Sequence, residues 1–106
     1  MPRNATTFNI RKESYDRCLK FIESGEFDAM ASMVTYAIRC FYYHLVESGT
    51  TSIDHIVRKD LVRISLRPED FVFNQIIDMG ICSKSEIPDY ALNYFLTWRG
   101  GLDDKG

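Results

Sequence analysis

The sequence predicts a mainly α-helical fold with two short β-strands, built from two strand–helix–helix repeats in one chain. The first observation is internal similarity, because moving the chain over itself by 54 positions aligns apolar and aromatic residues of its two halves. The aligned pairs are Phe8 with Val62, Ile10 with Ile64, Leu19 with Phe73, Ile22 with Ile76, Phe27 with Ile81, Met33 with Ile87, Tyr36-Ala37 with Tyr90-Ala91, and Phe41 with Phe95. The second observation is that each half opens with polar–apolar alternation and continues with apolar residues at helical spacing. Two copies are too few for a solenoid, so the repeat predicts an internal pseudo-dimer.

Length and composition favour one core that is shared by both repeats. The chain has 106 residues and a hydrophobic content of 45%. Half of such a chain would bury too small a fraction of its surface to be stable alone. We therefore expect a first repeat over residues 1–48, a connector over 49–60, and a second repeat with a short tail over 61–106.

The first repeat is predicted to contain one strand and two helices. Residues 7–11 alternate between polar and apolar side chains, which is the pattern of a half-buried strand. Apolar residues then recur on one helical face at Tyr15, Cys18, Leu19 and Ile22. Gly25 is expected to end this helix with a positive φ, and Asp28 to cap the next helix. That second helix is apolar over more than half of its circumference as far as Leu45, so we expect it at the centre of the core.

The connector and the second strand follow. Ser48, Gly49 and the two threonines after them break the helical pattern, and a short helical turn is expected within the connector at residues 53–57. The second predicted strand covers residues 61–67. One face of that strand carries Val62, Ile64 and Leu66, and the other face carries Arg63, Ser65 and Arg67.

The helices of the second repeat have their own boundary signals. Pro68 suits the first position of a helix, and Gly80 suits the residue after its end. Residues 83–86, Ser-Lys-Ser-Glu, form a capping box that is expected to start the last helix. This helix is expected to end near Gly100, and Pro88, about one turn inside it, is expected to kink it.

The charges are unevenly distributed although the formal net charge is only −2. Basic residues gather in the two strand segments and beside them, at Arg3, Arg11, Lys12, Arg58, Lys59, Arg63 and Arg67. Acidic residues lie in the helices and the tail, at Glu23, Glu26, Asp28, Glu47, Asp78, Glu86, Asp89, Asp103 and Asp104. A chain with a small net charge can still present a basic face to a polyanion.

Several classes of protein are disfavoured by what the sequence contains. The three cysteines lack Cys-x-x-Cys spacing and lie among apolar residues, so we expect small buried side chains and no disulfide framework. Cys40 and His44 share a helix face and His55 is the second histidine, but this is too few ligands for a closed metal site. We expect no metal, no cofactor and no enzyme active site, since Gly-rich phosphate loops and nucleophile motifs are missing. The apolar run at residues 40–46 is too short to span a membrane, and a cytoplasmic protein is expected.

The order strand, helix, glycine, capped helix resembles the ribbon-helix-helix DNA-binding family of the Arc and MetJ type. The resemblance lies in residues 7–11, Thr-Phe-Asn-Ile-Arg, in residues 63–67, Arg-Ile-Ser-Leu-Arg, and in residues 83–87, Ser-Lys-Ser-Glu-Ile, and it covers roughly residues 6–47 and 61–99. It implies that the two strands pair antiparallel into one ribbon above four interlocked helices, and that the ribbon enters the DNA major groove. Members are usually single-copy chains that dimerise, whereas this chain carries both copies.

The repeats align equally well at a shift of 56 positions, which places Arg11 on Arg67. The strand register between the repeats therefore stays open, but both shifts are even and leave the same side chains on the outer face. In the first repeat Asp28, Ala29 and Met30 stand where the family often has Ser or Thr with basic neighbours.

The resemblance implies two sets of DNA-binding residues. The base-reading set is the polar face of the two strands: Thr7, Asn9, Arg11, Arg63, Ser65 and Arg67. Arg suits guanine, Asn suits adenine, and Ser or Thr suits either base edge. The phosphate-binding set is the start of the last helix: Ser83, Lys84 and Ser85. The alternative interpretations are a solvated strand face and an ordinary helix cap.

The function predicted from the sequence is a sequence-specific transcriptional regulator, a repressor of the prokaryotic type, with double-stranded DNA as its partner. Self-association of chains on DNA is one further expectation, and a membrane partner is not expected. Two alternatives stay open. One is a protein-interaction module of the same fold, antitoxin-like or an assembly protein, which the acidic net charge and Asp28 favour. The other is a non-specific architectural DNA-binding protein.

Overall fold

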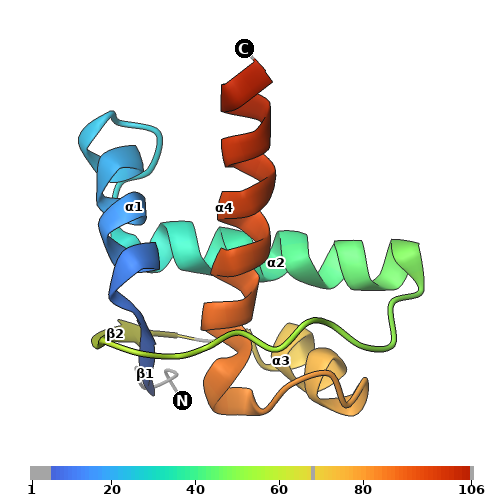
Figure 1. The fold of residues 1–106 in the computed structure, drawn as a ribbon. Helices are drawn as coiled ribbons and strands as arrows, with labels where there is room; N and C mark the ends of the chain where they lie inside the picture. Colours follow the sequence, from blue (N-terminus) through green and yellow to red (C-terminus); the bar gives the residue numbers. More distant parts are fainter. Residues whose placement is uncertain (1–5, 68, 106) are drawn as a thin grey trace.

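The protein is a mainly helical fold with one two-stranded antiparallel sheet (Figure 1). The computed structural model describes residues 6–67 and 69–105, and the side chains of these residues as far as Trp98. The elements follow in the order β1 (Thr6–Arg11), α1 (Lys12–Glu23), α2 (Met30–Ser48), β2 (Leu61–Leu66), α3 (Asp70–Asp78), the short 3-10 helix η1 (Lys84–Glu86) and α4 (Ile87–Lys105). The chain thus runs through strand, helix and helix twice.

The two strands pair with each other within one chain. They are antiparallel, and the register places Thr6 opposite Leu66, Asn9 opposite Arg63, and Arg11 opposite Leu61. The predicted antiparallel pairing is confirmed. We call this pair of strands the ribbon.

Helices α2 and α4 pack against each other at the centre of the molecule, where α4 crosses α2 in Figure 1. Further contacts join the two halves of the chain: α1 packs on α4, and α3 packs on α2. The ribbon follows the same rule, because β1 contacts α4 and β2 contacts α2. Each strand therefore lies against the second helix of the other half.

One hydrophobic core contains residues from every strand and every α-helix, and from the connector. Phe8 of β1 and Phe73 of α3 show how the halves share it, since their ring centroids are 5.7 Å apart. In α2 the buried side chains are Met33, Val34, Ala37, Ile38, Phe41 and Leu45, which agrees with the central position expected for this helix.

Glycines end the first helix of each half, as predicted. Gly25 follows α1 with a φ of +88°, and Gly80 follows α3 with a φ of +70°. This left-handed conformation is strained for residues with a Cβ atom, so glycine is the favoured residue at both positions.

The predicted start of α2 is wrong by one residue. Ala29, not Asp28, is the N-cap, and it makes no side-chain capping hydrogen bond because alanine has no acceptor. The helix begins at Met30.

The predicted kink at Pro88 is also wrong. The capping box at Ser83 is present, but it caps η1, and α4 begins only at Ile87. Pro88 therefore lies in the first turn of α4, where its missing N–H costs no helical hydrogen bond. At its other end α4 continues through Gly100 to Lys105, beyond the expected end. Pro68 lies outside the described residues, and α3 begins after Glu69.

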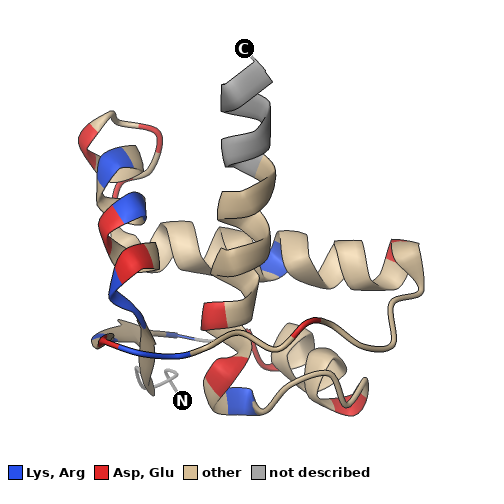
Figure 2. Ribbon diagram, in the orientation of Figure 1, with Lys and Arg blue, Asp and Glu red and all other residues tan. Residues whose placement is uncertain are grey.

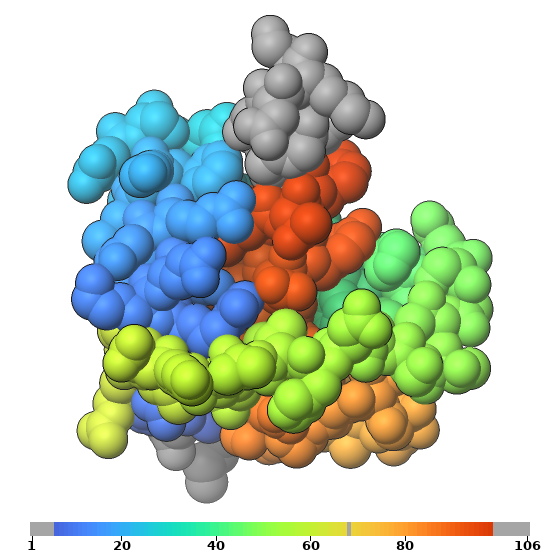
Figure 3. Space-filling view, viewed as in Figure 1, coloured from blue at the N-terminus to red at the C-terminus, as the bar shows by residue number. Residues whose placement is uncertain are grey.

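The connector between Gly49 and Asp60 carries no helical turn, so the short turn expected at residues 53–57 is wrong. Instead the connector is held by side-chain contacts across the molecule. The backbone N–H of Ile56 donates to the Tyr90 hydroxyl at 3.3 Å, and this hydroxyl also lies 3.0 Å from His55 Nδ1. Ile56 is itself buried, so it anchors the connector to α4. Figure 3 shows the connector lying across the front of the molecule.

Because the ribbon closes within one chain, thermal unfolding should not depend strongly on protein concentration. A folded unit made of one chain melts at a temperature that is independent of dilution, whereas an obligate dimer loses stability as its concentration falls. The measurement is a set of circular-dichroism melts over a wide concentration range. A melting temperature that rises steadily with concentration would show instead that folding requires two chains.

Candidate nucleic-acid interface

The outer face of the ribbon is exposed and mostly polar, although Leu61 at the start of β2 also lies on it. Thr7 pairs with Ser65 and Asn9 pairs with Arg63, and all four side chains are exposed. The opposite face is buried in the core and consists of Phe8, Ile10, Ile64 and Leu66 together with the half-buried Val62. Alternate residues of a strand point to opposite faces, so the core on one side fixes which side chains face outward on the other.

Two arginines supply positive charge to this outer face. Arg63 lies in the middle of β2, and Arg67 follows directly after its end, and both are exposed. Within the described residues, no ion pair involves either of them. Figure 2 shows that basic residues also mark the end of the connector and the start of α1, close to the ribbon. The ribbon face therefore has the charge and the donors to contact an anionic surface.

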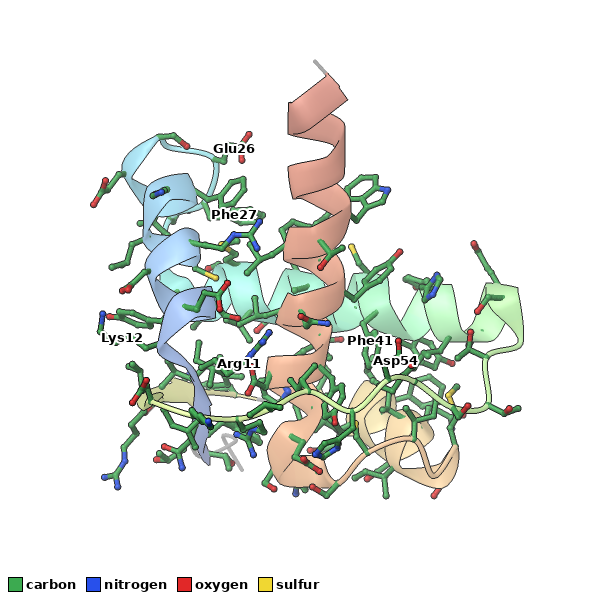
Figure 4. All side chains as sticks on the ribbon, viewed as in Figure 1. Arg11, Lys12, Glu26, Phe27, Phe41 and Asp54 are labelled. Atoms are coloured by element: carbon green, nitrogen blue, oxygen red, sulfur yellow. The ribbon has the colours of Figure 1, made fainter. Side chains whose placement is uncertain are left out.

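Arg11 is placed differently from the other predicted base-reading residues. Its Nε lies 3.3 Å from Asp89 Oδ1, and its Nη2 lies 2.9 Å from Asn93 Oδ1 and 3.4 Å from Ser14 Oγ. The side chain is only 19% exposed. The guanidinium donors of Arg11 are thus used by acceptors within the protein. The Arg11 side chain therefore does not join the other predicted base-reading residues on the outer face of the ribbon (Figure 4).

Asp89 is the centre of a buried charge cluster that sequence reasoning missed. Its side chain has no exposed surface, and its two oxygens are shared between two arginines: Oδ1 with Arg11, and Oδ2 with Arg58 Nε at 2.8 Å. Arg58 also donates through Nη2 to the backbone carbonyl of Asn9. The cluster therefore joins the end of β1, the connector and the start of α4. The one signal in the sequence was an acidic residue in the first turn of a helix, which is too common to indicate a buried ion pair.

The predicted phosphate-binding residues lie at η1. Ser83, Lys84 and Ser85 are exposed, and η1 lies next to β1. The Glu86 carboxylate occupies the cap, because its Oε1 accepts from Ser83 Oγ at 2.7 Å and from the Ser83 backbone N–H at 3.4 Å. These hydrogen bonds from Ser83 lower the pKa of Glu86, so this site carries a carboxylate as well as the Lys84 ammonium.

A polar hollow lies beside the end of β2, and sequence reasoning did not find it. It has a volume of about 510 Å³ and is formed by the end of β2 and the first turns of α2. Arg67 and Arg39 line it together with the hydroxyl residues Ser32, Thr35 and Ser65. Arg39 is already paired with Glu69 at 2.5 Å. No periodic pattern could have revealed this hollow, because its residues come from two elements that meet only in the fold.

The histidines contact aromatic rings. His44 is stacked on Tyr94 with ring centroids 4.5 Å apart, and His55 lies beside Tyr90. In the part of the chain that the structure describes, no three His, Cys, Asp or Glu side chains gather as a metal site would require.

The cysteines are free thiols, of which Cys18 is fully buried while Cys40 and Cys82 are half-buried. Burial raises the pKa of Cys18 to about 12 and that of Cys82 to about 11. A thiol reacts as its thiolate, and the thiolate fraction falls about tenfold for each unit by which the pH lies below the pKa.

At a pH near 8 we expect Cys18 to react with a thiol reagent at least a hundredfold more slowly in the native chain than in denaturant, and more slowly than Cys82. The measurement uses variants that keep one cysteine each. Equal rates for Cys18 in the native and the unfolded chain would contradict its burial.

Comparisons with models of known protein families, with curated proteins and with solved structures found no match to this chain. Among the described residues, no helix combines the length and the apolar character needed to cross a membrane. Conclusions about function therefore depend on the geometry of the ribbon and its surroundings.

Proposed function

We propose that this chain is a single-chain counterpart of the ribbon-helix-helix dimer and acts as a sequence-specific DNA-binding regulator. The observation that carries the proposal is the ribbon itself: a two-stranded antiparallel sheet with an outward face of Thr7, Asn9, Arg63 and Ser65, extended by Arg67. Such a ribbon has the width to enter the major groove of DNA.

The packing of the helices supports the pseudo-dimer. In a symmetric dimer, a contact from one subunit to the other has a matching contact in return. Two sets of contacts match in this way: α1 packs on α4 and α3 on α2, while β1 packs on α4 and β2 on α2. These matching contacts support the proposal that the two halves correspond to two subunits around one ribbon.

The outward side chains suit base recognition. Arg63 can donate two hydrogen bonds to guanine, Asn9 can pair with adenine through two hydrogen bonds, and Thr7 and Ser65 can contact either base edge. Arg63 and Asn9 are directly opposite each other in the ribbon, so they would reach neighbouring base pairs. Arg11 is left out of this set because it is held by Asp89.

Phosphate contacts are proposed at the two edges of the ribbon. Lys84 stands at η1 beside β1, and Arg67 lines the hollow beside β2. A DNA duplex that receives the ribbon in its groove presents phosphates on both sides of that groove, and such contacts fix position without reading sequence.

The test compares Arg63→Ala and Lys84→Ala in binding titrations against a duplex that the parent protein selects from random sequences and against a scrambled duplex. Arg63→Ala should cost about 1–3 kcal/mol on the selected site and should relax preference at one or two base pairs. Lys84→Ala should weaken binding to both duplexes alike. It should also reduce the slope of the logarithm of the binding constant against the logarithm of the salt concentration by about one. Lys20→Ala is the matched control, because Lys20 is an exposed lysine about 12 Å along α1 from the ribbon.

Absence of binding by the parent protein to either duplex at low salt would refute the proposal. Binding that is strong, salt-dependent and equal for all sequences would leave only the non-specific architectural alternative.

A protein-interaction module is the second candidate function, and exposed aromatic side chains favour it. Phe71 is 66% exposed and Tyr43 is 56% exposed, and both rings contact Tyr42. Aromatic residues are enriched in protein interfaces, and the chain's formal net charge of −2 does not by itself attract nucleic acid. This candidate replaces the first if no duplex is bound.

A further inference from the structure

A hollow with aromatic walls lies where α2, the connector and α4 meet. Its volume is about 320 Å³, which is within the range of small-molecule sites. Phe41 comes from α2 and Asp54 from the connector, and both line it. Figure 4 shows these two residues next to each other beside α4, and in Figure 3 the same three segments meet at the surface.

The walls of the hollow are aromatic on two sides. Tyr94 of α4 packs against Phe41 with ring centroids 6.0 Å apart and stacks on His44 at 4.5 Å. Tyr90 adds its buried ring, and Trp98 stands at the rim with 51% of its surface exposed. Ring faces carry partial negative charge, so a wall of this kind attracts cations as well as apolar groups.

The one formally charged residue in the described lining of the hollow is acidic. Asp54 is exposed on its lining, and none of the described side chains that line it is a lysine or an arginine. Within the described residues no ion pair neutralises Asp54. A second carboxylate lies one helical turn beyond the hollow, since Glu47 follows the lining residue His44 by three positions in α2. A ligand of this hollow therefore meets a negative potential.

We propose that this hollow is a binding site for a small organic cation, one that joins an ammonium group to an aromatic or apolar body. Asp54 receives the ammonium through a charge-assisted hydrogen bond, and the rings of Tyr94 and Trp98 cover the body of the ligand. An anion is disfavoured because the lining offers it a carboxylate and no cationic side chain.

The chain provides its own reporter for the test, because Trp98 is the one tryptophan and lies at the rim of the hollow. The experiment titrates the protein alone, without DNA, with 2-phenylethylamine and with 3-phenylpropanoate, at constant ionic strength and near neutral pH. These probes carry the same ring and opposite charges. We expect a saturable change in Trp98 emission with the amine, and binding of the carboxylate that is at least about tenfold weaker.

Two variants assign the effect to the site. Asp54→Asn keeps the shape of the side chain and should weaken binding of the amine by about tenfold. Asp78→Asn is the matched control, because Asp78 is an exposed carboxylate at the end of α3 and does not line the hollow. It should leave the affinity unchanged. Circular dichroism of each variant verifies that it is folded.

Three outcomes would overturn the proposal: no saturable change with the amine, equal binding of both probes, or full affinity in Asp54→Asn. Equal binding of both probes would indicate a plain apolar hollow. Since the titration contains no DNA, each of these results is distinct from a failure of the DNA-binding proposal.

Discussion

Replacing Asp89 with alanine is expected to lower the free energy of unfolding by about 3–5 kcal/mol. The Asp89 carboxylate is fully buried and is bonded by Arg11 at 3.3 Å and by Arg58 at 2.8 Å. Its removal leaves two guanidinium groups, which are only 19% and 20% exposed, without their counter-ion. A buried charge that loses its partner pays its desolvation cost without compensation, which is why the expected loss is large.

The matched control is Asp16→Ala, which removes the carboxylate of an exposed ion pair. Lys12 and Asp16 are 2.9 Å apart, but their side chains are 62% and 51% exposed. Exposed pairs of this kind contribute about 1 kcal/mol or less, so this variant should be nearly as stable as the parent. Urea unfolding of both variants gives the comparison. If the two substitutions change stability equally, the cluster around Asp89 does not hold the fold together.

The same cluster connects stability with the proposed function. Arg11 ends β1, and Arg58 bonds the carbonyl of Asn9 in the middle of that strand. Asp89 therefore fixes the position of the strand whose outer face we propose to read DNA. Substitutions at Arg11 are expected to act through the stability and the position of the ribbon, because the side chain itself is turned toward α4.

The sequence was sufficient to predict the elements whose signals are local. Polar–apolar alternation identified both strands, and helical spacing identified α1 and α2. Gly25 and Gly80 marked the ends of helices because the backbone there has a positive φ. These signals depend only on the local backbone geometry, so they can be recognised in the sequence when no tertiary contact is known.

The sequence-based predictions failed where a tertiary contact, or the position of a helix start, determines the local structure. Arg11 is in register with the outward residues of β1, but it is the last residue of the strand, and a carboxylate 78 positions later in the chain draws its guanidinium inward. Pro88 is compatible with α4 because the capping box belongs to the separate 3-10 helix η1, which leaves Pro88 in the first turn of α4. The helical turn expected near Ile56 did not form, because its backbone N–H bonds a tyrosine of α4 instead.

The candidate sites were only partly predictable for the same reason. The outer face of the ribbon follows from alternation alone, so Thr7, Asn9, Arg63 and Ser65 were found. The hollow beside Arg67 and the aromatic hollow beside Asp54 each combine residues of separate elements. Their members have no fixed spacing in the sequence, and only the packing of the helices brings them together.

Replacing Phe8 with alanine is the second change with a large expected effect, about 3–5 kcal/mol of unfolding free energy. Phe8 is 4% exposed and lies on the inner face of β1. Its ring meets Phe73 of α3, which is 3% exposed. Truncation would leave a cavity between the ribbon and α3, and a core of this density cannot close it without rearrangement.

The control for this substitution is Phe71→Ala. Phe71 belongs to the same helix as Phe73 but is 66% exposed, so its loss should cost well under half as much. Both variants are measured by urea unfolding. A loss at Phe8 no larger than the loss at Phe71 would mean that the ribbon is not packed on α3.

The double variant of Phe8 and Phe73 determines whether the two halves form one cooperative unit. Residues in contact give a combined effect that differs from the sum of the single effects, and for a tilted aromatic pair at 5.7 Å we expect a coupling of about 0.5–1.5 kcal/mol. Phe8 belongs to the first half and Phe73 to the second, so this coupling measures a contact between them directly. If the effects are additive, this contact does not couple the two halves, and the proposed single-chain pseudo-dimer loses energetic support. A clear coupling within one unfolding transition means that the ribbon and the helices beneath it form and unfold together.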